Sequence, residues 1–162
     1  MTLLHRKLAG NVVLNATADD PMVGAFAYCA EPATNPAAAA AAVGGGGVTL
    51  VLVNFDVNGS KTVEIGKAGL NVGGAELFSL FGLRAPLPPR PAPADIIRLV
   101  TSTDIYLNGA SAPLRVSASG GVGIKGASVG GTVALPGLGV AFVSLPNANA
   151  TACVSVSNNL PM

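Results

Sequence analysis

The chain has 162 residues, which is enough for one domain with a buried core and too few for two large domains. Half of the residues are hydrophobic, which excludes disorder caused by low hydrophobicity, and only 10% are charged, against about 25% in an ordinary soluble domain. The nine Lys and Arg residues nearly balance the eight Asp and Glu residues and form no long basic segment, so we expect no nucleic-acid partner.

The first predicted element is a short helix. Residues 2–9 place Leu3, Leu4 and Leu8 on one helical face, and Gly10 is expected to end the helix. From there the pattern becomes that of β-strands, at residues 11–16 and 25–30. Residues 36–47 are rich in alanine and glycine and bounded by Pro36, so we expect a loop insertion and not a stable helix.

The clearest predicted strand covers residues 48–55, which are apolar on both faces, as in a central strand between two layers. The dipeptide Asn58-Gly59 separates it from an alternating strand at residues 61–65, and this arrangement predicts a β-hairpin. Another strand is expected at residues 75–81. Residues 86–93 include five prolines, which predicts a stiff connecting loop.

The C-terminal half has a second Asn-Gly turn, at Asn108-Gly109, between the segments 104–107 and 114–116. Residues 120–131 are glycine-rich and predict a flexible loop, and the last strand is expected at residues 140–145. Seven or eight short strands with turns between them indicate an all-β fold, an antiparallel β-sandwich. Four aromatic residues within strand patterns are expected in the core: Phe26, Tyr28, Phe55 and Phe142.

The two cysteines, Cys29 and Cys153, show no spacing that suggests a metal site. Composition alone supports two alternatives about equally: two free buried thiols, or one long-range disulfide. Three N-glycosylation sequons, which begin at Asn15, Asn58 and Asn149, favour secretion slightly.

The first twenty residues do not read as a signal peptide. The longest strongly apolar run is far shorter than the ~20 residues of a spanning helix, so we expect no transmembrane segment.

No group of residues in the sequence indicates catalysis. His5 is the only histidine, and Asp19, Asp20 and Asp56 lack calcium-loop spacing and are interpreted as turn residues. The glycine-rich segments 44–47 and 120–123 lack the lysine and helix of a phosphate loop. Because the chain has no Trp and few other aromatics, an independent sugar-binding platform is disfavoured. We expect no catalytic residue, metal or cofactor.

Several segments follow one another in an order found in a known family. They are residues 3–10 with Val13-Leu14, the strand 25–29 with Tyr28 before Cys29, the strand 48–55, Leu107-Asn108-Gly109 followed by Leu114, and the closing residues 134–146 and 150–153. Together they resemble the C-terminal domain of heparanase-like proteins of glycoside hydrolase family 79, in the plant-type branch. The resemblance runs from Leu3 to Cys153 and departs at residues 36–47, at the prolines and in the tail.

The resemblance implies a division of the chain into three parts. Residues 1–10 would be a remnant of the last helix of a catalytic barrel, residues 11–154 a β-sandwich accessory domain with loops at 36–47 and 86–93, and residues 155–162 a tail. It also implies a disulfide between Cys29 and Cys153, and a secreted location or a compartment of the lysosome or vacuole type, with a position peripheral to a membrane as a further alternative.

Family members pair this sandwich with a (β/α)8 barrel that cleaves glucuronic acid linkages with retention, using two barrel carboxylates about 5 Å apart. The family's acid follows an Asn, and no Asn-Glu dipeptide occurs here. We therefore expect a non-catalytic accessory domain of a heparanase-like β-glucuronidase, as a fragment or split domain. Its partner would be the barrel, in the same or a separate chain. The alternative is a stand-alone secreted binding or adhesion module.

Overall fold

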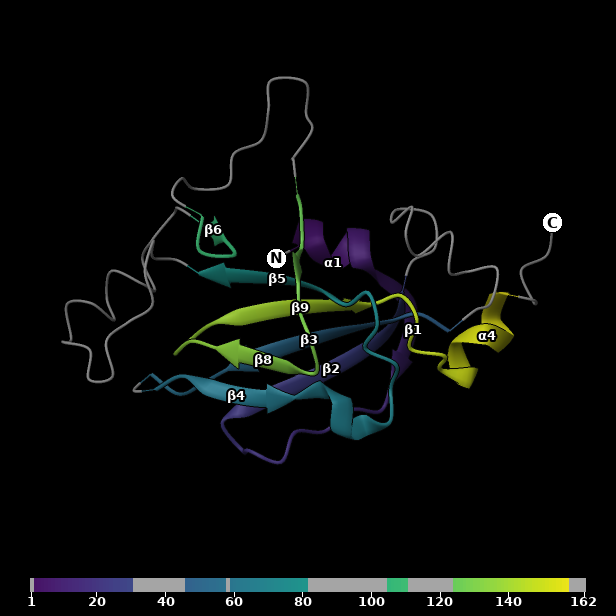
Figure 1. Ribbon diagram of the computed structural model, residues 1–162, viewed down its shortest axis with the longest axis horizontal. Coiled ribbons are helices and arrows are strands. Elements are labelled where there is room, and N and C mark those ends of the chain that lie inside the picture. Colours follow the sequence, from purple (N-terminus) through teal and green to yellow (C-terminus); the bar gives the residue numbers. More distant parts are fainter. Residues whose placement is uncertain (1, 31–45, 58, 82–104, 111–123, 158–162) are drawn as a thin grey trace, which may run out of the picture.

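A computed structural model describes residues 2–30, 46–57, 59–81, 105–110 and 124–157, and antiparallel strands dominate it (Figure 1). The helices are α1 (Thr2–Leu8), α4 (Thr151–Ser157) and the 3-10 helix η1 (Ile65–Ala68). The strands are β1 (Ala9–Leu14), β2 (Val23–Ala30), β3 (Val48–Asn54), β4 (Lys61–Glu64), β5 (Glu76–Phe81), β6 (Tyr106–Leu107), β7 (Ala127–Ser128), β8 (Thr132–Leu135) and β9 (Val140–Leu145).

The strands form two sheets, in which each described pair is antiparallel. The larger sheet has the order β1-β2-β3-β9-β5-β6, with β7 also pairing with β5, and the smaller sheet consists of β4 and β8 (Figure 1). We call the face of the larger sheet that is turned toward β4 and β8 its inner face, and the opposite side its outer face. The predicted all-β sandwich is confirmed.

The main core lies between the two sheets. Val48 and Leu52 of β3 point to the inner face, where they join Val143 of β9 and meet Val133 and Leu135 of β8 in one buried cluster. The last three side chains are fully buried. Burying apolar area at about 25 cal/mol per Å² is the main force that holds the two layers together.

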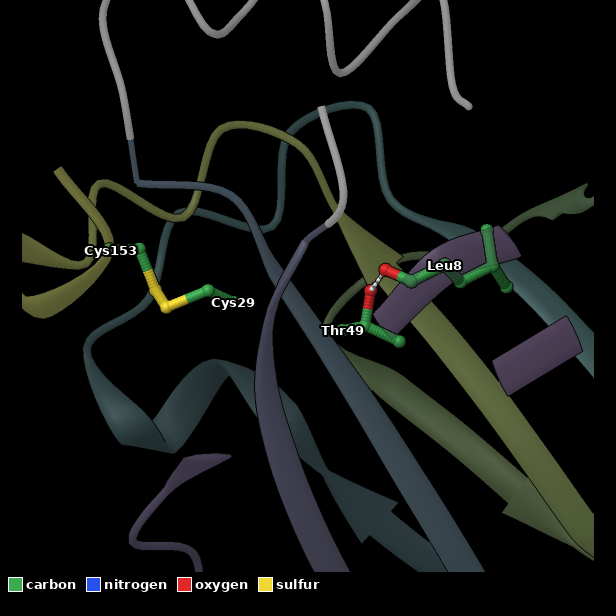
Figure 2. Close-up of a disulfide and its surroundings, with 4 residues drawn as sticks. All are labelled: Leu8, Cys29, Thr49 and Cys153. Carbon is green, nitrogen blue, oxygen red and sulfur yellow. Dashed lines mark hydrogen bonds between the residues drawn. A yellow bond between two sulfur atoms is a disulfide. The ribbon is translucent and has the colours of Figure 1, made fainter. Parts of the chain in front are cut away.

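A second core lies on the outer face, under α1. Leu4 and Leu8 of the helix cluster there with Val51, Phe78 and Phe142 of the sheet. The buried Thr49 hydroxyl donates a hydrogen bond of 2.6 Å to the Leu8 carbonyl and so fixes the end of the helix to β3 (Figure 2). The helix predicted at the N-terminus is confirmed. Its presence explains why β3 is apolar on both faces.

The hairpin predicted between β3 and β4 is wrong. β3 pairs with β2 and β9, whereas β4 pairs with β8 in the other sheet. The chain changes sheets after Asn54, whose buried amide donates to the carbonyls of Leu135 and Pro136 at 3.1 and 2.9 Å. Asn58 itself lies outside the described residues.

Gly10 does not end the helix by a glycine cap, because it already belongs to β1. A Cβ atom at this position would lie 2.8 Å from the carbonyl oxygen of Cys29, so the glycine permits close approach of β1 to β2. The register between the two strands is irregular between Ala9 and Val13, as at a β-bulge.

Two elements differ from expectation in the C-terminal half. Part of the predicted glycine-rich loop forms β7, which pairs with Glu76 and Leu77 of β5. The chain then ends its described part in α4, which the sequence did not predict because Thr, Val and Ser are weak helix formers. The predicted features at residues 36–45, 86–93, 114–116 and 120–123 lie outside the described residues.

Candidate interaction surfaces

The two cysteines meet in a disulfide, with Cα atoms 5.4 Å apart (Figure 2). Cys29 comes from β2 and Cys153 from the first turn of α4, and both side chains are buried. The bridge ties the C-terminal helix to the larger sheet across 124 residues of sequence. The pairing expected from the resemblance is therefore present, and the reading of two free thiols is wrong.

The outer face of the larger sheet carries exposed aromatic side chains. Phe26 of β2 is 49% exposed and Phe55, directly after β3, is 54% exposed. Their rings converge above Gly24: a Cβ atom built there would lie 3.0 Å from Phe55 Cε2 and 3.5 Å from Phe26 Cε2. Both residues were predicted to be core, and that prediction is wrong, whereas Phe142 is buried and Tyr28 is partly buried.

Val13 extends this apolar area onto the neighbouring strand. It pairs with Tyr28, so its side chain lies on the same face as Phe26, and it is 69% exposed. We call Val13, Phe26 and Phe55 the outer patch. No sequence signal marked them as exposed, because strand periodicity shows which face a residue occupies but not whether that face is covered.

An open cleft of about 710 Å³ lies on the other side of the same sheet. One wall is the inner face of β2 and β3, with Ala25, Ala27 and Leu50, and another is β4 with the start of η1, including Val63 and Ile65. The third wall is the segment of residues 15–20, which connects β1 toward β2. The cleft brings together side chains that are far apart in the sequence.

One lysine ties this connecting segment to β4. Lys61 Nζ lies 3.0 Å from Asp20 Oδ2 and 3.2 Å from Asp56 Oδ2. The backbone N–H of Met22 and then the Lys61 ammonium lower the pKa of Asp20, and Asp20 and then Asp56 raise the pKa of Lys61. The Met22 hydrogen bond to Asp20, 2.8 Å long, agrees with the prediction of a turn aspartate.

The remaining predicted positions are dispersed. His5 is exposed and its ring packs edge-on to Tyr28 at a centroid distance of 4.9 Å. Asn15 and Asn149 are both exposed, so glycosylation at these sequons stays a prediction, while Asn58 lies outside the described residues. Within the described part of the chain, no three His, Cys, Asp or Glu side chains are grouped as a metal site would require.

The geometry defines a class of protein, an antiparallel β-sandwich domain with one buried disulfide, an outer apolar patch and an inter-sheet cleft. No protein-family model matches the chain, and no curated protein matches it with significant sequence similarity. Among the helices that the structure describes, none is long and apolar enough to cross a bilayer.

Proposed function

We propose that this chain is the non-catalytic accessory β-sandwich of a heparanase-like β-glucuronidase, and that its outer face packs against the (β/α)8 catalytic barrel. The observation that carries the proposal is the outer patch, which lies on the same face of the larger sheet as α1. Val13, Phe26 and Phe55 are each about half exposed or more, although they belong to or directly follow strands of the larger sheet.

A partner on the outer face has a simple physical rationale. Adjacent exposed aromatic rings are costly in water, and rigid aromatic side chains are typical anchors of protein interfaces. α1 already buries one part of this face through Leu4 and Leu8. In the resemblance, α1 corresponds to the last barrel helix, so a barrel continuing from that helix would lie beside the outer patch.

The buried disulfide supports an oxidising compartment for this domain. A secreted location, or a lysosome- or vacuole-type compartment, follows for the parent enzyme, and the exposed sequons at Asn15 and Asn149 would be compatible with it. The substrates of that enzyme would be glucuronides or glycans that contain glucuronic acid. The catalytic carboxylates would come from the barrel.

The proposal is tested by supplying the barrel. A heparanase-like barrel produced without its own sandwich is co-expressed in a secretory host with this chain, and hydrolysis of 4-methylumbelliferyl β-D-glucuronide is measured in the soluble fraction. We expect this chain to increase the rate of hydrolysis measured in the soluble fraction. With the double variant Phe26→Asp/Phe55→Asp this increase should be at least about tenfold smaller, because the variant places charges at the centre of the interface.

Ala134→Asp is the matched control, since Ala134 is exposed on β8, on the far side of the smaller sheet. It should retain the full gain. If the wild-type chain does not bind or solubilise the barrel, or if the Phe26 and Phe55 variant performs as well as the control, the proposal is wrong. The reading frame directly upstream of this chain gives a second test, because the proposal expects a barrel with an Asn-Glu motif there.

The alternative is a stand-alone secreted binding or adhesion module. The converging rings of Phe26 and Phe55 support this alternative as well, because exposed aromatic rings can stack against a sugar or a partner surface. This alternative expects a signal peptide directly before the domain, no affinity for a barrel, and loss of glycan or cell-surface binding in the same Phe26→Asp/Phe55→Asp variant.

A further inference from the structure

We propose that the cleft between the two sheets is a binding site for a small amphiphile that has an aliphatic body and a cationic head group. This proposal is independent of the one above. The cleft lies on the inner face of the larger sheet, whereas the outer patch lies on the opposite face. Either proposal can therefore fail without the other.

The cleft exists because the two sheets have unequal width. In the described residues the smaller sheet has two strands, and the larger sheet extends beyond it through β2 and β1. Small side chains line the space that results: Ala25 and Ala27 on β2, and Ala16 and Ala18 on the connecting segment. The volume of about 710 Å³ lies within the range of roughly 300–1,000 Å³ that is typical of small-molecule sites.

The deep part of the cleft is apolar. Val48 and Leu52, at the bottom, are almost fully buried, while Leu50 and Val63 remain partly accessible. An aliphatic chain placed there would replace water against these side chains at a gain of about 0.8 kcal/mol per buried CH₂ group. The deep part of the cleft therefore selects an aliphatic body.

The mouth of the cleft is acidic. Its lining includes the carboxylates of Asp19 and Asp20 together with neutral polar side chains, and among the side chains that the structure describes there it includes no Lys, Arg or His. Asp20 and Asp56 share the nearby Lys61 ammonium, so these three side chains keep one formal negative charge between them. The exposed Asp19 carboxylate adds a second negative charge. A cationic head group is therefore attracted to the mouth and a carboxylate head group is repelled.

The test compares two amphiphiles with the same aliphatic body. Dodecyltrimethylammonium and laurate are titrated into the purified, oxidised chain by isothermal calorimetry, each below its critical micelle concentration. We expect saturable 1:1 binding of the cation, and laurate binding weaker by at least about tenfold. Asp19→Asn, on the exposed connecting segment, should weaken binding of the cation by roughly two- to fivefold, since it removes one screened charge.

The location is tested by filling the cleft. Ala25→Phe places a ring in the cleft and should weaken cation binding by at least about tenfold, whereas the matched control Ala134→Phe, on exposed β8, should not. Cooperative unfolding and an intact disulfide are checked for each variant. Should Ala25→Phe fail to fold, Asp19→Asn and the laurate comparison still decide the question.

Three outcomes overturn the proposal. The first is the absence of saturable binding by either amphiphile. The second is binding of laurate as tight as that of the cation, which removes the role of the acidic mouth. The third is loss of binding in Phe26→Asp with no loss in Ala25→Phe, which would place the amphiphile on the outer patch instead of in the cleft.

Discussion

Asn54 is fully buried at the end of β3, where its side chain joins two sheets. Its amide group donates to the carbonyls of Gly59, Leu135 and Pro136 at 3.0, 3.1 and 2.9 Å, and its carbonyl oxygen accepts from the Asp56 N–H at 2.9 Å. The three carbonyls share the two N–H hydrogens of this amide, and the Pro136 carbonyl also accepts from the Gly139 N–H at 2.9 Å. Loss of the Asn54 side chain in this low-dielectric site is costly for the groups that keep no other partner.

The substitution Asn54→Leu should lower the free energy of unfolding by about 2–4 kcal/mol, because it leaves buried polar groups without partners. The measurement is urea denaturation of the oxidised protein. Asn147→Leu is the control: Asn147 is exposed and makes a single 2.9 Å bond to the Gly73 carbonyl, so its loss should cost less than about 1 kcal/mol. Equal losses in the two variants would show that the Asn54 network is not what stabilises the junction.

At the scale of elements, the connecting segment of residues 15–20 is held to β4 by Lys61. The pKa of Asp20 is lowered, so its contribution to stability is fully present above the ordinary value of 3.8 and is lost as pH falls through the folded-state pKa. The pKa of Lys61 is raised, so its contribution is present below the ordinary 10.5 and is lost as pH rises through the higher folded-state value.

Lys61→Met should therefore lower the melting temperature by a small, constant amount from about pH 5 to about pH 9, and the difference from wild type should shrink below the pKa of Asp20. Thermal unfolding followed by circular dichroism over this pH range is the measurement, and high salt should reduce the effect. The exposed Lys125→Met serves as control. A difference between Lys61→Met and wild type that persists unchanged at pH 2 would contradict the ion-pair account.

At the scale of the whole molecule, the central strands of the larger sheet are apolar in both directions because they are covered on both faces. The smaller sheet covers the inner face and α1 covers part of the outer face, so β3 and β9 need apolar residues in both directions. The disulfide then closes the fold by fixing α4 against β2. A bridge that closes so long a loop stabilises the fold mainly by constraining the unfolded chain.

Replacing both cysteines, as Cys29→Ala/Cys153→Ala, should lower the free energy of unfolding by roughly 4–5 kcal/mol in the chain-entropy model of a long closed loop. Intact mass after alkylation, with and without reductant, gives the independent check: neither thiol should react before reduction. Reduced wild-type protein should match the double variant in stability. Two thiols that alkylate in the folded, unreduced protein would refute the bridge and remove the main support for a secretory compartment.

Much of the strand content could be predicted, since β2, β3, β5 and β9 follow from β-branched and apolar runs. Pairing could not. The Asn58-Gly59 dipeptide is a local hairpin signal, and it was outweighed by the long-range fit of β4 to β8. Neither the exposure of Phe26 and Phe55 nor the cleft was visible in the sequence. The exposure depends on how far α1 covers the outer face, and the cleft depends on how far the smaller sheet covers the inner face.

The sequence by itself determined an all-β chain with an N-terminal helix and apolar residues on both faces of a central strand. Local periodicity and side-chain chemistry are sufficient for these conclusions. Only the tertiary structure decided that Cys29 meets Cys153, that Lys61 bridges two aspartates, and that one side of the larger sheet carries an exposed patch and the other a cleft. These features depend on tertiary packing, because in the described residues they follow from how α1 covers the outer face of the larger sheet and how β4 and β8 cover its inner face.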